Sequence, residues 1–191
     1  MALDLDLPQN VYWDTCVFIA HLSGDAVAYG DYLADIDQFL REAENGKLSI
    51  HCSTITIAEI TRANLGTGLE YSDFEKMWGN GVVPISPDVN TMRVASELRS
   101  LVYTKTGGKR KLSTPDAIHL ASALELQETY GVPLDMFHTF DRGNSRDHDG
   151  KGVPIIGFET WCEACLDDPL AKKIIALNRS EPAHPNKELA V

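Results

Sequence analysis

Residues 10–22 read NVYWDTCVFIAHL, and this stretch indicates how the fold begins. Residues 11–13 are a short apolar run that ends in a polar turn, which is typical of a buried strand. Residues 15–22 then have the character of a short helix. The stretch therefore predicts a strand followed directly by a helix, with the acidic residue Asp14 at the junction.

Farther along the chain, apolar runs typical of strands continue to alternate with amphipathic segments typical of helices. Strands are predicted at residues 48–52, 82–85, 136–140 and 153–157. Helices are predicted at residues 32–45, 55–65, 72–78, 89–105, 115–130, 160–166 and 170–178. Strands that alternate with helices indicate an α/β fold with a mainly parallel sheet. We expect one domain over residues 1–157, and a C-terminal helical extension and tail over residues 158–191.

Composition excludes several classes of protein. The chain has 191 residues, 17 bases and 28 acids, and its net charge of −11 argues against a general nucleic-acid-coating protein. No apolar run approaches the roughly 20 residues of a membrane span. Residues 1–9 alternate Leu with Asp and lack the pattern of a signal peptide. Four cysteines are too few and too scattered for a disulfide framework. We therefore expect a soluble, cytoplasmic protein that does not bind membranes.

The charge is nevertheless uneven, because residues 93–111 carry six bases and only one acid. Lys109, Arg110 and Lys111 lie shortly before Asp116 in the chain. We expect them near the mouth of any site that includes Asp116, where they would bind RNA phosphates. The alternative is an ordinary solvated loop.

Four acids stand where an α/β fold would bring them together. Asp14 ends the first strand and Asp141 follows a late one, while Asp116 lies in the first turn of the clearest helix. Glu59 lies within a helix among apolar neighbours. Each acid also has a local alternative: a helix cap for Asp14, a helix-end charge for Asp116 with Thr114 as N-cap, an Asx turn for Asp141, and a salt bridge from Glu59 to Arg62.

Taken together, the four carboxylates predict a metal site. Carboxylates that converge on one strand-end pocket repel one another and resist loss of water. A divalent cation removes this conflict, and Mg²⁺ or Mn²⁺ prefers such oxygen ligands. A carboxylate-held cation of this kind activates water and stabilises charge on a phosphodiester.

At these residues the sequence resembles the PIN-domain nucleases. The resemblance covers about residues 11–157. It rests on an ordered set of motifs: Asp14-Thr15, Glu59, the run LSTPDAIHLA at 112–121, and Thr139-Phe140-Asp141. It implies a PIN-like, Rossmann-like α/β/α sandwich and cleavage of RNA with Mg²⁺ or Mn²⁺ as cofactor. It also implies Asp14, Glu59, Asp116 and Asp141 as the catalytic and metal-binding residues.

The resemblance extends to supporting residues and partners. Thr15 and Thr139 match polar positions that orient water or carboxylates in the family, and Asn144 lies near a further polar position. Many bacterial members are VapC-like toxins, which implies a homodimer and an antitoxin protein as partners. The chain is longer than the compact members, with extra segments at residues 66–83 and after residue 157. A non-catalytic PIN-fold module that binds RNA or a protein partner is the alternative function.

Two further residue patterns each have a functional and a packing interpretation. His119 lies on the same helix face as Asp116, where it either lines the pocket or packs and hydrogen-bonds beside it. Cys162 and Cys165 have zinc-ligand spacing, but the chain has no second cysteine pair, so two partly buried helix cysteines are favoured.

Overall fold

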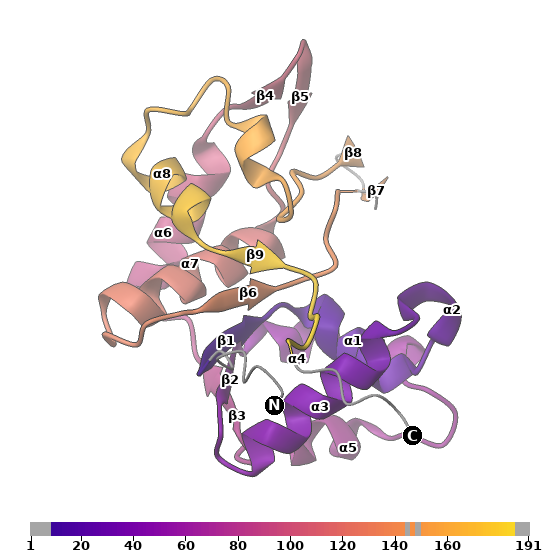
Figure 1. The fold of residues 1–191 in the computed structure, drawn as a ribbon. Coiled ribbons are helices and arrows are strands. Elements are labelled where there is room, and N and C mark those ends of the chain that lie inside the picture. The colour runs from indigo at the N-terminus through magenta and orange to yellow at the C-terminus, as the bar shows by residue number, and fades with distance from the viewer. Residues whose placement is uncertain (1–8, 144–145, 148–149, 186–191) are drawn as a thin grey trace, which may run out of the picture.

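A five-stranded parallel sheet forms the centre of the protein (Figure 1). The structure, a computed structural model, describes residues 9–143, 146–147 and 150–185. The strand order is β3-β2-β1-β6-β9, and every neighbouring pair is parallel. These strands are β1 (Asn10–Trp13), β2 (Ser49–Ser53), β3 (Val82–Ile85), β6 (Met136–His138) and β9 (Arg179–Ser180). Two antiparallel hairpins lie outside the sheet: β4 (Tyr103–Lys105) with β5 (Gly108–Arg110), and β7 (Arg146–Asp147) with β8 (Gly150–Lys151).

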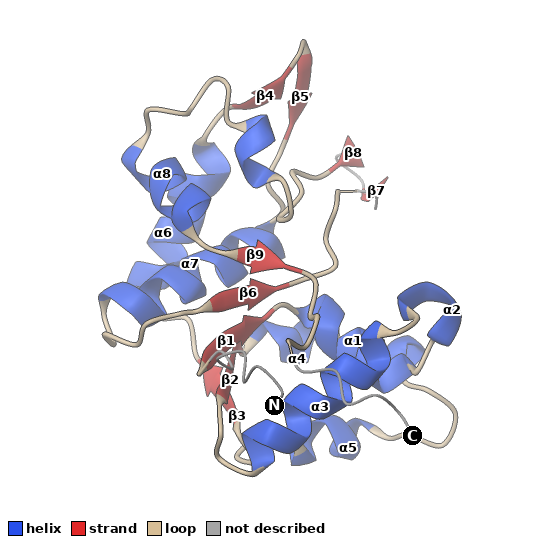
Figure 2. Cartoon of the chain, in the orientation of Figure 1, coloured by secondary structure: helices blue, strands red, loops and turns tan. Residues whose placement is uncertain are grey.

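Helices flank the sheet on both faces, as Figure 2 shows. On one side lie α1 (Thr15–Ser23), α2 (Ala26–Tyr29), α3 (Tyr32–Glu44) and α5 (Tyr71–Lys76). On the other lie α6 (Val89–Ser100), α7 (Thr114–Glu128) and α8 (Pro169–Ala176). The short helix α4 (Ile55–Glu59) follows β2, and two 3₁₀ turns cover Arg62–Asn64 and Phe158–Trp161. The predicted α/β class, with a mainly parallel sheet between helices, is confirmed. None of the helices in the described ranges has the length and hydropathy needed to cross a membrane.

The central strand β1 explains why both faces are covered. Its side chains alternate across the sheet, so Tyr12 packs in the core beneath α6 and α7. Val11 and Trp13 pack in the core beneath α1 and α3. All three side chains are fully buried. A strand buried on both faces reads as a continuous apolar run, which is why residues 11–13 were recognisable.

The chain changes direction across the sheet between β1 and β6. From β1 the strand order runs to β2 and β3 on one side, whereas β6 and β9 are added on the other. In open α/β sheets, ligands bind in the crevice outside the carboxyl ends of strands at such a switch point. Asp14 directly follows β1, and residues 139–141 directly follow β6, so both sequence motifs lie at this crevice.

Two predicted helices are shorter than expected. The helix at 55–65 ends at Glu59, because the backbone amide and hydroxyl of Thr61 both donate to Asn64 Oδ1 and start a separate 3₁₀ turn. The helix at 89–105 ends at Ser100. Residues 103–110 instead form the β4–β5 hairpin, whose two-residue turn has positive φ at both Thr106 (43°) and Gly107 (80°).

The C-terminal part differs more. Residues 153–157 are not a strand, and residues 160–166 form a 3₁₀ turn and loop rather than a helix. The predicted helix at 170–178 is present as α8. After it, β9 pairs with β6 at Phe137↔Arg179 and His138↔Ser180. The segment after residue 157 therefore supplies the last strand of the central sheet.

Candidate functional site

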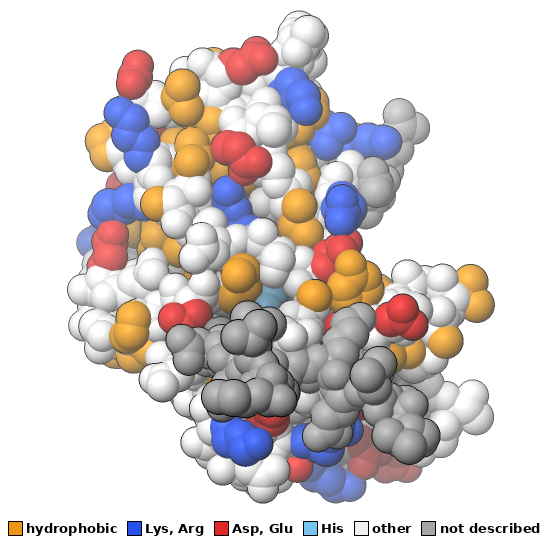
Figure 3. Space-filling view, in the orientation of Figure 1, with side chains coloured by type: hydrophobic (Ala, Val, Ile, Leu, Met, Phe, Trp, Pro, Cys, Tyr) orange, Lys and Arg blue, Asp and Glu red, His pale blue; other side chains and the backbone are white. Residues whose placement is uncertain are grey.

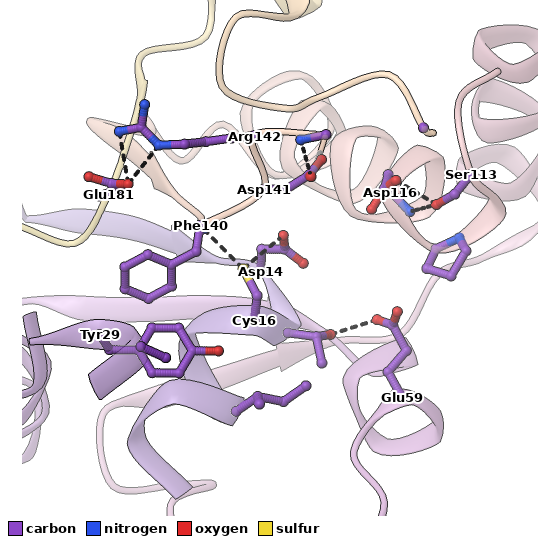
Figure 4. Close-up of a pocket in the computed structure, with 16 residues that line it drawn as sticks. Asp14, Cys16, Tyr29, Glu59, Ser113, Asp116, Phe140, Asp141, Arg142 and Glu181 are labelled. Carbon is purple, nitrogen blue, oxygen red and sulfur yellow. Dashed lines mark hydrogen bonds and ion pairs between the residues drawn. The ribbon is translucent and has the colours of Figure 1, made fainter. Parts of the chain in front are cut away.

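A cavity of about 690 Å³ opens at the carboxyl ends of β1 and β6. Figure 4 shows the side chains that line it. All four acids singled out in the sequence are among them: Asp14, Glu59, Asp116 and Asp141. The structure thus brings together residues that are separated by up to 127 positions in the chain. A fifth acid, Glu181, lines the same cavity and was not anticipated.

Asp14 is held at the end of β1 by hydrogen bonds from two neighbouring elements. Its side chain is only 8% exposed. Thr139, in the segment after β6, donates its hydroxyl to Asp14 Oδ2 at 2.7 Å. The Cys16 thiol donates to the same oxygen at 3.3 Å. The supporting role predicted for Thr139 thus has a direct geometric basis, because it positions the Asp14 carboxylate. No side-chain cap of α1 by Asp14 is found, contrary to the capping alternative.

Asp116 lies in the first turn of α7 and is bound by the residue that caps this helix. The N-cap is Ser113 rather than Thr114, and its hydroxyl accepts from the Asp116 amide at 3.1 Å. The same hydroxyl donates to Asp116 Oδ2 at 2.5 Å. Burial, and then the charge of Asp14, raises the pKa of Asp116 to about 7. The ionised form of Asp116 is therefore disfavoured in the folded chain.

Asp141 is fixed by backbone amides. Its Oδ1 accepts from Gly143 N at 2.8 Å and its Oδ2 accepts from Ile155 N at 3.0 Å. The first of these bonds is the Asx turn named as the local alternative, and it coexists with a place in the cavity wall. Burial raises the pKa of Asp141, and the charge of Asp14 adds to this, although the two amide hydrogen bonds work against the shift.

Glu59 has a different partner from the one expected. The sequence alternative was a salt bridge to Arg62, but Glu59 Oε2 instead lies 3.0 Å from His119 Nε2 and accepts from the Thr15 hydroxyl at 2.6 Å. Burial alone would raise the pKa of Glu59, but the hydrogen bond and charge of His119 outweigh it and lower the pKa. The predicted supporting residue Thr15 therefore donates a hydrogen bond to the Glu59 carboxylate.

His119 lies beneath the acids and does not line the cavity, so it belongs to the packed, hydrogen-bonded alternative. Its side chain is fully buried. Its Nδ1 lies 3.0 Å from the Tyr12 hydroxyl, and its Nε2 lies 3.4 Å from Asp14 Oδ1. Burial alone would lower the pKa of His119, but the charges of Asp14 and Glu59 outweigh it and raise the pKa. His119 is thus a buried counter-charge for one half of the acidic site.

The donor set suits a hard divalent cation, because it consists of carboxylate and hydroxyl oxygens. The raised pKa values of Asp116 and Asp141 also show that added positive charge would be stabilised there. Within the described ranges, however, no three His, Cys, Asp or Glu side chains are already arranged to hold one ion. The donor atoms of the site therefore suit a divalent cation, but the described side chains are not yet placed close enough together to hold one.

The predicted RNA-binding residues lie beside the cavity and do not line it. On the face drawn in Figure 3, Lys and Arg side chains gather over the β4–β5 hairpin. Lys109 and Lys111 are exposed, whereas Arg110 packs 4.1 Å above the Trp161 ring. Arg110 also donates to the carbonyl oxygens of Gly143 and Gly152, and both of these glycines line the cavity. Asn144, the third supporting residue, lies outside the described residues.

Sequence reasoning missed several residues that line the cavity. Arg142 is the only Lys or Arg among the lining residues that the structure describes. Its Nε and its terminal nitrogen Nη2 each lie 2.9 Å from Glu181 Oε1, and Tyr32 donates to the other Glu181 oxygen. Tyr29 and Cys16 also line the cavity. The signal for Arg142 was its position directly after the Thr139-Phe140-Asp141 motif, but nothing in the local sequence indicates Glu181.

The cysteine pair at 162 and 165 is buried in the core beneath α7 and α8. Neither cysteine is in a disulfide, and neither belongs to a metal-ligand group within the described part of the chain. Both lie in the loop after the 3₁₀ turn at Phe158–Trp161 instead of in a helix.

Comparison with known proteins does not identify the chain further. No family model matches it, and no curated protein matches it significantly. The structure defines an α/β protein with a five-stranded parallel sheet flanked by helices and an acidic cavity at its switch point.

Proposed function

We propose that this protein is a metal-dependent endoribonuclease of the PIN type, with Mg²⁺ or Mn²⁺ as its cofactor. The observation that carries the proposal is that Asp14, Glu59, Asp116 and Asp141 line one cavity at the switch point of the sheet. Their order along the chain and their contexts are those of the family motifs. The cation would be held by Asp14, Asp116 and Asp141, with Glu59 as a further ligand or as a residue that orients water.

A bound cation would supply Lewis-acid activation of water and stabilise the charge that develops on a phosphodiester. The chain's own residues would hold the reacting groups in place. Thr139 orients Asp14, Ser113 orients Asp116, and the amides of Gly143 and Ile155 orient Asp141. Carboxylates held in this way need little reorganisation during the reaction.

Glu59 supports a different role from the three aspartates. Its hydrogen bonds to Thr15 and His119 keep it ionised without a metal ion. An ionised carboxylate at the cavity wall can accept a proton from an attacking water. We therefore favour water orientation over direct metal binding for Glu59.

The test is RNA cleavage by purified protein with Mg²⁺ or Mn²⁺, compared with Asp14→Asn and Asp116→Asn variants. We expect both variants to lose cleavage while their far-ultraviolet circular dichroism is unchanged. Asp167→Asn is the matched control, because Asp167 is fully exposed and pairs only with Lys172 among the described residues. Cleavage at the wild-type rate by the Asp14→Asn, Asp116→Asn double variant would show that the acids are not the active site.

The alternative, a non-catalytic module of the same fold, predicts a different response to metal. A ligand at 100 times its dissociation constant stabilises the folded state by about 2.7 kcal/mol. We expect Mn²⁺ to raise the melting temperature of the wild type, and Asp116→Asn to remove that rise. A protein that shows neither a shift nor cleavage would be such a module.

The toxin role and the homodimer are separate proposals that rest on the resemblance. Expression of a toxin should halt growth of the host cell, and Asp116→Asn should restore growth. An antitoxin partner would then suppress the wild-type effect when it is co-expressed. Normal growth with an active nuclease would exclude the toxin role and leave the chemistry in place.

A further inference from the structure

The cavity has an aromatic wall as well as an acidic one. Figure 4 shows the rings of Tyr29 and Phe140 on one side of Asp14, while Glu59 and Asp116 lie on the other. The two ring centroids are 4.9 Å apart, with an angle of 51° between the planes. Ile19 also lines the cavity. Aromatic surface therefore adjoins the carboxylates within one space of about 690 Å³.

The aromatic wall is joined directly to the acidic site. Phe140 immediately precedes Asp141, so the same segment after β6 supplies a ring and a carboxylate to the cavity. The backbone amide of Phe140 donates to Cys16 Sγ at 3.1 Å, and the Cys16 thiol donates to Asp14 Oδ2 at 3.3 Å. If the rings held one part of a ligand, the adjoining part of the same ligand would lie next to the carboxylates.

The position of Tyr29 is set by the backbone around it. Asp25 caps α2, since its Oδ1 accepts from Val27 N and Ala28 N, both at 3.0 Å. Gly30 then ends the helix at φ 50° and ψ −128°, a conformation open essentially to glycine alone. Phe140 is supported by an edge contact to Tyr32, with ring centroids 5.4 Å apart. Contacts within the protein therefore hold both rings in this wall.

The charged side chains on this side of the cavity are Arg142 and Glu181, which form an ion pair with each other. Arg142, which follows Asp141, lines the cavity and its side chain is 56% exposed. Aromatic rings offer a nucleotide base a stacking surface, and carboxylates that suit a divalent cation can bind its phosphate through that ion. The cavity volume lies within the usual range of about 300–1,000 Å³ for such sites.

We propose that Tyr29 and Phe140 form a stacking subsite for one unpaired base of the RNA strand, adjacent to the carboxylates. The inference rests on the proposed nuclease function and specifies its substrate. A base can occupy this wall only when it has left a helical stack, so the strand is single-stranded at the site of cleavage. Stacking on aromatic rings accepts every base, and it therefore selects unpaired structure more than sequence.

The test uses short oligoribonucleotides that carry the fluorescent base 2-aminopurine at successive positions. Binding is measured to the Asp116→Asn protein, so that the strand stays intact. We expect quenching at one position, and we expect Tyr29→Leu to remove it and weaken binding roughly 10-fold. Tyr29→Phe keeps the ring and should retain both signals. Tyr130→Leu is the matched control, because Tyr130 is 57% exposed and does not line the cavity.

Cleavage kinetics give a second, independent readout. In protein that retains Asp116, Tyr29→Leu should raise KM and change kcat by less than about 2-fold. The reason is that stacking stabilises the bound substrate and the transition state equally. A fully paired RNA hairpin stem should be cut slowly by the wild type and be insensitive to Tyr29→Leu.

The outcomes separate this inference from the nuclease function. Unchanged RNA binding and KM in Tyr29→Leu, with cleavage abolished by Asp14→Asn, would overturn the stacking subsite and leave the nuclease standing. Failure of the wild type to cleave any RNA would overturn the nuclease itself. Loss of a protein inhibitor's effect in Tyr29→Leu, with RNA binding intact, would make the wall a protein-docking site and overturn the inference.

Discussion

Glu59 and Asp116 line the same cavity, yet folding shifts their pKa values in opposite directions. Glu59 has a buried partner in His119, and its pKa lies below the ordinary value. Among the described residues, Asp116 has the Ser113 hydroxyl as its side-chain partner, and burial together with the charges of Asp14 and Asp141 raises its pKa to about 7. Within the described part of the chain, the site thus has a buried imidazole in contact with Glu59 and no such partner in contact with Asp116. The half without a counter-charge is the half where a metal ion is expected.

The largest effect should follow from removing the internal cation. His119→Ala leaves Glu59 and Asp14 without their buried partner, and breaking a buried ion pair costs about 3–5 kcal/mol. Urea unfolding should show this loss. His119→Gln keeps a hydrogen-bonding side chain and should lose less. His21→Ala is the control, because its pair with Asp37 is exposed and is worth about 1 kcal/mol or less. Equal losses in both alanine variants would refute the comparison.

The next effect is the pH dependence that Asp116 imposes on the metal-free protein. Its folded pKa lies above the unfolded value near 3.8, so its stabilising contribution is complete below pH 4 and is lost as the pH rises to about 7. The loss is at most about 4 kcal/mol for a shift of this size. Unfolding measured in a chelator between pH 4 and 8 should show it. Asp116→Asn should flatten this profile, and an unaltered profile would contradict the assignment.

Glu59→Gln tests the opposite side. The pKa of Glu59 is lowered, so the charged form stabilises the fold above its ordinary pKa near 4.5. At pH 7 the substitution should cost about 1–2 kcal/mol, as for other hydrogen bonds to charged groups. Asp116→Asn should change stability in the other direction at the same pH. Shifts of the same sign in thermal melts of the two variants would mean that both acids share one environment.

The smallest effect should come from the hydroxyl partner of Asp116. Ser113→Ala removes the N-cap of α7 and should cost about 1 kcal/mol. It also removes a hydrogen bond that lowers the pKa of Asp116. The pH at which metal-free stability declines should therefore move upward. Ser100→Ala is a suitable control, because that hydroxyl lies at the exposed end of α6. A lower transition pH in Ser113→Ala would exclude this role.

The part of the site that could be predicted from sequence is the part set by local pattern. Asp14 follows an apolar run, and Asp116 follows a Ser-Thr-Pro helix start, so each lies at an element end that the chain itself marks. Parallel strands bring such ends to one edge, which is why the four acids could be grouped. The sequence could place His119 beside the site, but it could not predict the shift in its pKa. The contacts of His119 to Tyr12 and Glu59 join residues that are 107 and 60 positions apart in the chain.

The unpredicted parts of the fold lack a local signal. Strand β9 is only two residues long and carries Arg179 and Ser180, so no apolar period marks it. The first residues of the segment 103–110 could continue a helix, but the two-residue turn at Thr106 and Gly107 makes the segment a hairpin. The environment of Glu181 could not be foreseen, because its partners Arg142 and Tyr32 are distant in sequence.

Strand β9, which pairs with β6, is the last strand of the central sheet to leave the ribosome. Until residues 179–181 have emerged, β6 presents an open sheet edge, and Arg142 has no carboxylate from Glu181 beside it. A nascent chain at that stage already holds β1, β2, β3 and β6, together with every acid from Asp14 to Asp141. Translation therefore delivers the carboxylates first and the last wall of their pocket afterwards.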